Sequence, residues 1–452
     1  MKTSRNNFPE RIAILALVTL LAVVVAGCSR RDAAQAQALP AERPSRPALD
    51  PLAVVLASHH GGHRVDVQIR EHQGMVRSNL QREAALERLG WLYVAKARDS
   101  FDAGFYALAE QCGLALEGMR AGNAAALLLR GHALHSQHRF GEAGELARRL
   151  VASRGLAADY GLLGDVLIDV GRVDEAAQAY QAMLDLKPDP QGYARAAHLR
   201  WLKGDREGAA EVMRMAVAGS SPRDPGSAAW MHTQLARYLW QAGTTTEAGA
   251  WVDSALSLRS DYPPALLLRG RMLLADGKPA DAAVPLELAA KLNPLPEYQW
   301  ALADAFRAAN RAADAERVER EILARGPADD ARGCALFLAT RRQQPSLALR
   351  LARQELAGRG DVFSHDAVAW ALAASGDFTN ATTHMRAALQ LGTPDPRLWL
   401  HAGVIAFHNG RRAESERWLR QAEDSRACLL PGECARLDEV KELLRATAMR
   451  VP

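Results

Sequence analysis

The sequence predicts an all-α fold: a solenoid of about ten helical hairpins that ends in a C-terminal capping helix. Three observations support this prediction. Alanine, leucine and arginine dominate the 452 residues and aromatic residues make up only 6%, a composition typical of helices. Apolar residues recur at helical spacing, and each apolar run is broken at a regular position. The whole pattern returns at a period near 34 residues, which is typical of stacked helical hairpins.

The break in each hairpin is a glycine or asparagine. In the stretch from Asp159 to Pro188, the first helix ends at Gly171 and the second stops at Pro188. Glycine and asparagine tolerate the left-handed conformation that commonly follows the last residue of a helix. The same position of the repeat is occupied by Gly171, Gly243, Gly277, Asn310, Gly376 and Gly410.

A small residue opens the second helix of each hairpin and gives the period directly. The residues at this position are Ala103, Ala143, Ala176, Ala210, Ala248, Ala282, Ala315, Ala348, Ala381 and Ser415. Their successive spacings are 40, 33, 34, 38, 34, 33, 33, 33 and 34 residues. Since no hairpin can bury its apolar face alone, ten units in phase predict a stack stabilised mainly by contacts between neighbours.

The first 27 residues are predicted to be a signal peptide. Lys2, Arg5 and Arg11 form a positive segment, and the uncharged apolar run from Ile12 to Ala26 follows it. This run of fifteen residues is too short for a comfortable membrane span and suits the apolar region of a signal. It ends in the sequence Val-Ala-Gly-Cys at residues 25–28.

This ending resembles the lipobox of bacterial lipoproteins, in which small residues precede a cysteine that becomes lipidated. The resemblance implies that Cys28 carries the lipid and is the first residue of the mature chain. Ser29 in place of aspartate then favours the outer membrane. The alternative is a plain secretory signal with a chance cysteine. Residues 28–64 are predicted to be a flexible tether, since Arg30–Pro47 is rich in Ala, Gln, Pro and Arg.

The repeats resemble the tetratricopeptide repeat (TPR) family, whose pattern places leucine-glycine and a large residue on the first helix. The nearest matches are Leu89-Gly90 with Tyr93, the unit Tyr160–Pro188 and the unit Leu266–Pro294. The resemblance covers residues 79–425 and implies a right-handed superhelix with a concave inner face. His198 and Leu336 depart from the pattern at the glycine position. A capping helix is expected at residues 65–78, and a turn and second capping helix at 426–452.

The remaining cysteines fall into two groups. Cys112 and Cys334 stand alone among apolar residues and are predicted to be buried. Cys428 and Cys434 flank a Pro-Gly turn. In an oxidising compartment they form either a disulfide across that turn or two free thiols.

Neither catalytic motifs nor a nucleic-acid-binding pattern is found in the sequence. HExxH, GxSxG, a phosphate-binding loop and a strand-associated GxGxxG are all missing. The formal charge is +4, and acidic and basic residues alternate without a basic block, so no nucleic-acid partner is indicated. We therefore expect a non-enzyme without a cofactor.

Histidines occur in two groups that need separate interpretation. His59, His60 and His63 are dense enough to be weak metal candidates, but the glycines among them favour a polar hinge. His132 and His135 lie three residues apart and so share one helical face. Two histidines lining a groove are the favoured reading of this second pair.

The TPR resemblance implies that particular positions of each first helix line the concave groove. These positions are enriched in Trp, Arg and His, the types common at interface hot spots. Arginines there suit acidic groups of an extended peptide. The predicted groove residues are Trp91, His132, His135, Asp165, Arg237, Trp240, Arg271, Asp304, Arg307, Arg341, Trp370 and His408.

Taken together, the sequence predicts a non-catalytic scaffold on the bacterial outer membrane. The lipid at Cys28 would be its only membrane attachment, and the solenoid would face the periplasm. Its groove would bind protein or peptide partners in cell-envelope assembly. The alternative is an accessory protein that handles a metal or an envelope polymer through its histidines.

Overall fold

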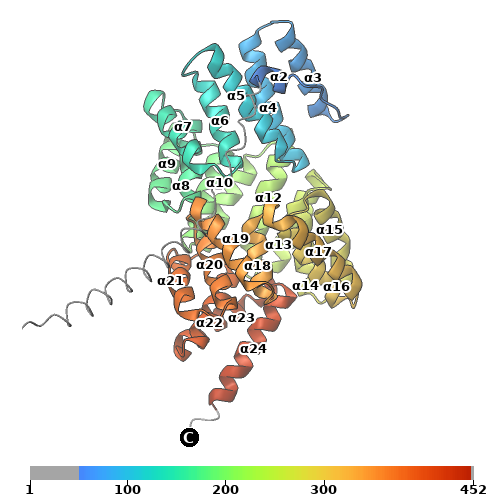
Figure 1. The fold of residues 1–452 in the computed structure, drawn as a ribbon, viewed down its shortest axis with the longest axis vertical. Coiled ribbons are helices and arrows are strands. Elements are labelled where there is room, and N and C mark those ends of the chain that lie inside the picture. Colours follow the sequence, from blue (N-terminus) through green and yellow to red (C-terminus); the bar gives the residue numbers. More distant parts are fainter. Residues whose placement is uncertain (1–49, 449–452) are drawn as a thin grey trace, which may run out of the picture. The chain divides into compact units, whose positions relative to one another are not determined.

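Ten helix pairs follow one another from Arg82 to Asp424 in a computed structural model of the chain, in which residues 50–448 are described (Figure 1). The first helices of the pairs are α4 (Arg82–Ser100), α6 (Ala124–Ser136), α8 (Ala157–Asp169), α10 (Pro190–Leu202), α12 (Pro225–Gln241), α14 (Pro263–Ala275), α16 (Pro296–Ala308), α18 (Ala331–Thr340), α20 (Val362–Ala374) and α22 (Pro396–His408). The second helices are α5 (Gly104–Met119), α7 (Phe140–Ser153), α9 (Val173–Leu186), α11 (Arg206–Ala218), α13 (Thr245–Leu258), α15 (Pro279–Leu292), α17 (Ala312–Asp329), α19 (Pro345–Gly358), α21 (Phe378–Leu389) and α23 (Arg412–Asp424). Between residues 50 and 448 there is no β-strand, which confirms the predicted all-α solenoid.

Further helices flank the ten pairs. Before them lie α2 (Pro51–Val55) and α3 (Arg64–Arg77), and after them come a short 3₁₀ turn, η1 (Arg426–Cys428), and α24 (Pro431–Ala448). In the part of the chain that the structure describes, no helix is both long enough and apolar enough to cross a membrane.

The predicted helix stops have the backbone conformation that glycine and asparagine favour. Gly171, Gly243, Gly277, Asn310, Gly376 and Gly410 all have φ between 60° and 86°. Other hairpins turn through His138, Gly204 and Arg342, with φ of 59°, 87° and 54°. His138 and Arg342 carry no glycine signal, so the sequence pattern did not mark their turns.

The small residue of the first hairpin was assigned wrongly. Ala103 is exposed and only caps α5, whereas Ala109 is fully buried inside that helix. The error arose because α4 runs on to Ser100, which delays α5 by about one and a half turns. From Ala109 to Ala143 the spacing is 34 residues, so the anomalous step of 40 disappears and the repeat is more regular than predicted.

Glycines on the first helices allow the two helices of a hairpin to approach closely. A Cβ placed on Gly164 would lie 2.2 Å from the Tyr180 ring, and one on Gly270 would lie 2.3 Å from Leu286 Cγ. These distances are far inside van der Waals contact, and the neighbouring side chains are packed on both sides. The glycine of the repeat is therefore required by the crossing of the helices.

We expect Gly164→Ala to destabilise the protein by about 1–3 kcal/mol, because the added methyl group overpacks the contact with Tyr180. Gly74→Ala is the matched control, since nothing lies within 4 Å of a Cβ at this exposed position inside α3. The control should be stabilised by up to about 1 kcal/mol through helix propensity. Urea unfolding of both variants measures the difference, and equal stabilities would refute the crossing argument.

Repeats far apart in the sequence also lie against each other. The Thr393 hydroxyl donates a hydrogen bond to the Leu202 carbonyl at 2.7 Å. The Phe363 ring stacks on Trp201 with ring centres 6.1 Å apart, and Figure 1 shows α20 beside the green helices that include α10. The fourth hairpin thus contacts the ninth hairpin and the segment before the tenth, and Arg359 after α19 pairs with Asp169 of the third hairpin.

The last part of the predicted flexible tether, residues 28–64, is not a tether in the structure, because it contains the helix α2. Val55 in α2 is fully buried in the core that α3, α4 and α5 share. His59 lies in this ordered region, with Nε2 2.9 Å from Asp66 Oδ1. The apolar residues of α2 (Pro51–Val55), which lie inside the predicted tether, were too few to show periodicity, so this helix was missed. Residues 1–49, which contain the predicted signal peptide, Cys28 and most of the tether, lie outside the described residues.

Candidate functional site

The predicted groove residues lie on the first helices of their hairpins, or directly after one in the case of Arg341, but they do not form one open groove. They fall into five separate clusters along the solenoid. Most of them contact other residues of the same chain, and several are buried. Each cluster is described below from the N-terminal end.

Trp91 and His132 form the first cluster. Their rings meet edge to face with centres 5.3 Å apart. Burial, reinforced by the nearby Arg98 guanidinium, lowers the pKa of His132 to about 3. His132 is therefore neutral at physiological pH, and its partly buried ring packs against Trp91 of the same chain.

His135 and Asp165 belong to a second cluster of ion pairs. His135 Nε2 lies 2.8 Å from Asp169 Oδ2, and Arg359 pairs with the other oxygen of Asp169, also at 2.8 Å. Asp165 accepts two hydrogen bonds of 2.7 Å from Arg195. Burial raises the pKa of Asp165, but the Arg195 guanidinium outweighs it and the pKa is lowered. The carboxylates that could bind a partner are thus satisfied internally.

The third cluster is occupied by the chain's own C-terminal segment. Arg271 donates a hydrogen bond of 2.6 Å to the carbonyl of Cys428 in η1. The Arg271 guanidinium lies over the Trp240 ring, 5.7 Å from its centre, and Trp240 is only 4% exposed. Arg237 similarly covers Trp201 at 5.2 Å. These residues hold residues 426–430 against the inner face.

The fourth cluster continues this arrangement one hairpin later. Arg341 pairs with Asp304 and, at 3.1 Å, with Glu319, which also pairs with Arg307. Asp304 is 2% exposed and accepts a hydrogen bond of 3.3 Å from the Gly432 amide of α24. Burial raises the pKa of Asp304 despite the opposing effect of Arg341. The predicted carboxylate-binding arginine Arg341 is therefore engaged within the chain.

Glu433 fixes the start of α24. Its carboxylate is 2.5 Å from Arg397 Nε and accepts a hydrogen bond of 2.8 Å from the Leu430 amide. Burial raises the pKa of Glu433, but Arg397 and the Leu430 amide outweigh this and lower it. Arg397 also covers the Trp300 ring at 5.2 Å. The C-terminal segment is thus locked to the inner face by a buried ion pair.

Cys428 and Cys434 are separate thiols in the structure, and the disulfide between them stays a prediction. The Cys428 thiol is directed to the Trp240 carbonyl at 3.7 Å, whereas the Cys434 thiol faces the Arg426 carbonyl at 3.8 Å. The segment between the two cysteines includes the start of α24 at Pro431. The two side chains therefore face different neighbours. Cys112 and Cys334 are free and buried, as predicted.

The fifth cluster, Trp370 and His408, lines a pocket with open access. The pocket has a volume of about 220 Å³ and lies between α18, α20, α22 and α24. Its lining residues are Ala339, Arg342, Trp370, Ala373, Ala374, Gly376, Phe378, His408 and Arg436. We call it the C-terminal pocket.

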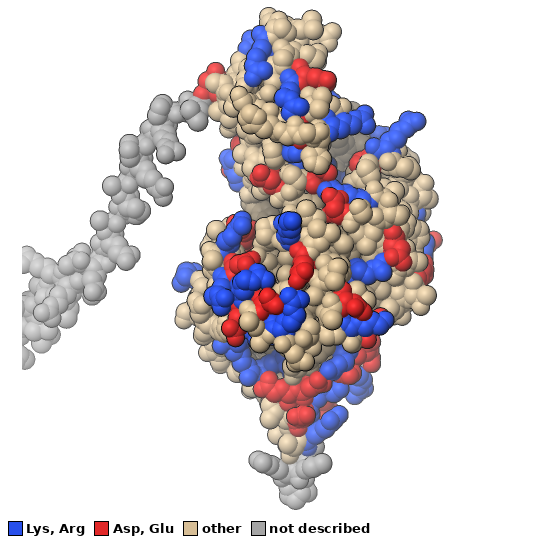
Figure 2. Space-filling view, turned by 90° about the vertical axis from the view of Figure 1, so that its right-hand side faces the viewer, with Lys and Arg blue, Asp and Glu red and all other residues tan. Residues whose placement is uncertain are grey.

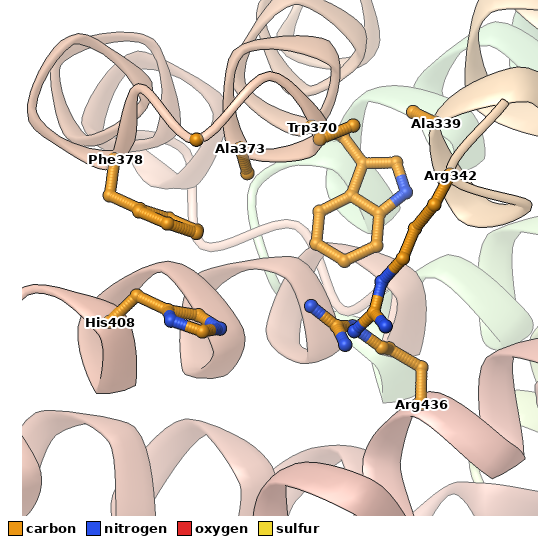
Figure 3. Close-up of a pocket in the computed structure, with 9 residues that line it drawn as sticks. Ala339, Arg342, Trp370, Ala373, Phe378, His408 and Arg436 are labelled. Carbon is orange, nitrogen blue, oxygen red and sulfur yellow. The ribbon is translucent and has the colours of Figure 1, made fainter. Parts of the chain in front are cut away.

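Aromatic rings form two walls of the C-terminal pocket. His408 stacks on Phe378 with ring centres 4.2 Å apart. Trp370 is held by a hydrogen bond of 3.0 Å from its Nε1 to Thr340 Oγ1. Burial lowers the pKa of His408, so this ring is neutral at physiological pH. Figure 3 shows the Phe378–His408 pair on one side of the pocket and Trp370 on the other.

Two guanidinium groups enter the same pocket from different elements. Arg342 comes from the turn after α18 and Arg436 from α24, and Figure 3 shows the groups side by side below Trp370. Both pair with Glu439: Arg342 at 2.8 Å and Arg436 at 2.5 Å. Two positive charges thus share one negative charge, and the pair keeps a net charge of about +1.

The weak metal candidates do not form a site. His59 is paired with Asp66, which Lys96 also contacts at 2.8 Å, while His60 and His63 are exposed. No group of three or more His, Cys, Asp or Glu side chains is arranged for a metal within residues 50–448. On the face drawn in Figure 2, acidic and basic side chains are intermingled rather than gathered by sign.

Sequence reasoning missed Arg342, Arg436, Phe378 and Glu439. Phe378 follows the glycine stop Gly376 by two residues. This spacing could have placed Phe378 directly after the turn of its hairpin, at the start of the second helix. Arg436 and Arg342 are 94 residues apart in the sequence, and only the packing of α24 brings them together. No local signal identifies such a pair.

The fold and its helical repeats define a class of protein: an α-solenoid built from hairpins of about 34 residues. The model of the tetratricopeptide repeat family matches residues 162–228 and 368–427, so the chain carries tetratricopeptide repeats in these two segments, and the described hairpins cross at glycines in the same way. Such repeats suggest a protein-interaction scaffold.

Solved structures and curated proteins were also compared. The chain is similar to yeast Tom70 at 14% identity and a TM-score of 0.35, over 85% of this chain and 96% of that one. It is similar to a tetratricopeptide repeat protein from Parabacteroides merdae at 18% identity and a TM-score of 0.32, over 57% of this chain and 98% of that one. No curated protein matches the chain.

Proposed function

We propose that this protein is a non-catalytic scaffold that is anchored to the bacterial outer membrane by lipid at Cys28 and binds a protein partner in the periplasm. The observation that carries the scaffold role is the stack of ten hairpins with the open C-terminal pocket. The Val-Ala-Gly-Cys sequence at residues 25–28 supports the anchor, and Ser29 supports the outer membrane.

Side chains on the inner face already bind other residues of the same chain, and this limits the surfaces on which a partner can bind. Arg271, Asp304 and Arg341 are already engaged by one another or by residues 428–432. A partner would have to break these contacts to use the inner face. At the C-terminal pocket a partner would have to displace only the exposed Glu439 carboxylate from the two arginines, and the cavity beside them is open. We therefore assign this pocket to the partner, and we propose cell-envelope assembly as the process that the protein serves.

The anchor is tested by fractionating cells that produce the protein or its Cys28→Ser variant. We expect the unaltered protein to stay with the outer membrane through a high-salt wash and the variant to become soluble in the periplasm. Cys112→Ser is the matched control, because this buried thiol should have no part in localisation. Retention of Cys28→Ser on the membrane after the wash would contradict lipid anchoring.

The scaffold role is tested separately by mild crosslinking in the native envelope, followed by reconstitution of any crosslinked protein with the purified chain. We expect a protein that forms a stoichiometric complex in solution. Crosslinks that are equally frequent with an unrelated outer-membrane lipoprotein, and no reconstituted complex, would contradict the proposed function.

A further inference from the structure

The C-terminal pocket has the chemistry of a site for one acidic group beside one apolar group. Its volume of about 220 Å³ corresponds to about seven water molecules at ~30 Å³ each, which limits the ligand to a single residue. The alanines of α20 and the rings of Trp370 and Phe378 provide apolar walls. The charged groups that line the cavity are the two guanidinium groups, and His408 is a further polar side chain in its lining.

The charge of the pocket selects an anion. Arginine presents planar N–H donors that match a carboxylate, and here two arginines share the single carboxylate of Glu439. The Arg436 side chain is only 13% exposed, whereas Arg342 is 53% and Glu439 42% exposed. Arg436 is thus the less exposed member of the pair, while Glu439 and Arg342 lie in contact with solvent.

Glu439 shows what the arginine pair recognises. Its carboxylate accepts hydrogen bonds from both Arg342, at 2.8 and 2.9 Å, and Arg436, at 2.5 Å. It sits on the solvent side of α24, and the aromatic cavity next to it is not filled by a side chain of the described residues. A ligand carboxylate with an apolar neighbour can replace it and also fill the cavity.

We propose that the C-terminal pocket binds a carboxylate carried next to an apolar or aromatic group of a protein partner, with Arg342 and Arg436 as its anion-binding residues and Glu439 as an internal competitor. This assignment rests on the proposed scaffold function and specifies the chemistry of its partner. The carboxylate comes either from the end of the partner chain or from an acidic side chain.

Fluorescence anisotropy of labelled peptides tests the assignment with the full mature chain. The first probe is a Gly-Ser-Gly-Ala-Phe peptide with a neutral, carboxylate-free fluorophore at its N-terminus and a free C-terminal carboxylate. The second is its C-terminal amide, and the third is that amide with glutamate in place of alanine. We expect at least one carboxylate probe to bind about tenfold tighter than the plain amide, as for one charge-assisted hydrogen-bond pair. Which carboxylate probe binds more tightly identifies the source of the group.

Single substitutions locate the binding site. Arg342→Gln and Arg436→Gln should each weaken the carboxylate probe about tenfold and leave the plain amide unchanged. Arg350→Gln is the matched control: this exposed arginine on α19 lies outside the pocket, and the variant should bind within about twofold of the unaltered chain. Circular dichroism melting checks that each variant is folded.

Glu439→Gln gives a readout that a purely structural role would not produce. Removing the internal competitor should tighten the carboxylate probe severalfold, since both guanidinium groups become free to bind it. Weaker binding by this variant would refute the competitor role. Equal binding of carboxylate and plain amide probes, or an equal loss in Arg350→Gln, would overturn the pocket assignment, while a reconstituted partner complex would still support the scaffold function.

Discussion

Replacing Glu433 by glutamine should destabilise the protein by about 3–5 kcal/mol, because it leaves the Arg397 charge without its buried partner. The Glu433 side chain is 1% exposed and Arg397 is 21% exposed. Burial alone would lower the pKa of Arg397, but the carboxylates of Glu433 and Asp395 outweigh it and raise the pKa. An arginine side chain keeps its proton in proteins, so Arg397 stays charged in the variant and cannot escape the cost by losing its proton.

Loss of this ion pair should also release the C-terminal segment. The Leu430 amide loses its acceptor, and residues 428–432 are the part of the chain that contacts Arg271 and Asp304. Hydrogen exchange should therefore accelerate in η1 and the first turn of α24 before it does so in the earlier hairpins. We expect this order because the contacts of Glu433 stabilise the start of α24 directly and the earlier hairpins only indirectly.

The matched control for Glu433→Gln is Glu439→Gln on the same helix. Glu439 is 42% exposed and pairs with arginines at the surface, so its replacement should cost at most about 1 kcal/mol. Urea unfolding monitored by circular dichroism compares the two variants. Similar stabilities for both would contradict the view that the C-terminal segment is locked by a buried charge pair.

Acidification from pH 7 to pH 4 should remove about 3 kcal/mol of stability through His132 alone. Its pKa lies at about 3 in the folded chain, against 6.5 without burial. Below pH 6.5 the unfolded chain therefore binds a proton that the folded chain rejects, and stability falls with each further drop in pH until about pH 3. Burial also lowers the pKa of His198, to about 4, which adds a loss of the same sign.

The contribution of His132 is isolated by comparing urea unfolding of the unaltered chain with that of His132→Gln at pH 7 and pH 4. The variant should lose about 3 kcal/mol less on acidification, because a glutamine takes up no proton. His60→Gln is the control, since His60 is exposed and its replacement should leave the pH dependence unchanged. If His132→Gln and the unaltered chain lost the same stability between pH 7 and pH 4, the folded chain would protonate His132 as readily as the unfolded chain does, which would contradict the prediction.

The hairpins could be predicted from the sequence because they depend on local features. Glycine or asparagine at positive φ ends the first helix, and a glycine allows the helices to cross, as at Gly164 and Gly171. The largest error of frame, Ala103 for Ala109, came from an unusually long α4. Local signals could not reveal it, because helix length at that end is decided by packing.

The inner face could not be predicted because contacts between distant repeats decide it. Arg271 binds the Cys428 carbonyl across 157 residues, and Thr393 binds Leu202 across 191. A periodic pattern indicates which side of a helix faces inward but not what fills the space there. Trp240 was predicted to contact a binding partner, but its side chain is only 4% exposed and packs inside the chain. Its replacement by alanine would test core packing rather than binding.

Photo-crosslinking shows most directly whether the partner binds in the C-terminal pocket or on the inner face. The Gly-Ser-Gly-Ala-Phe probe would carry a benzophenone group in place of its last ring, and crosslinked peptides would be mapped by mass spectrometry. We predict crosslinks within residues 339–342, 370–378, 408 and 436–439, and their loss in Arg436→Gln. Crosslinks on Trp91, Arg271 or Arg307 that persist in this variant would contradict the claim and return the binding site to the inner face.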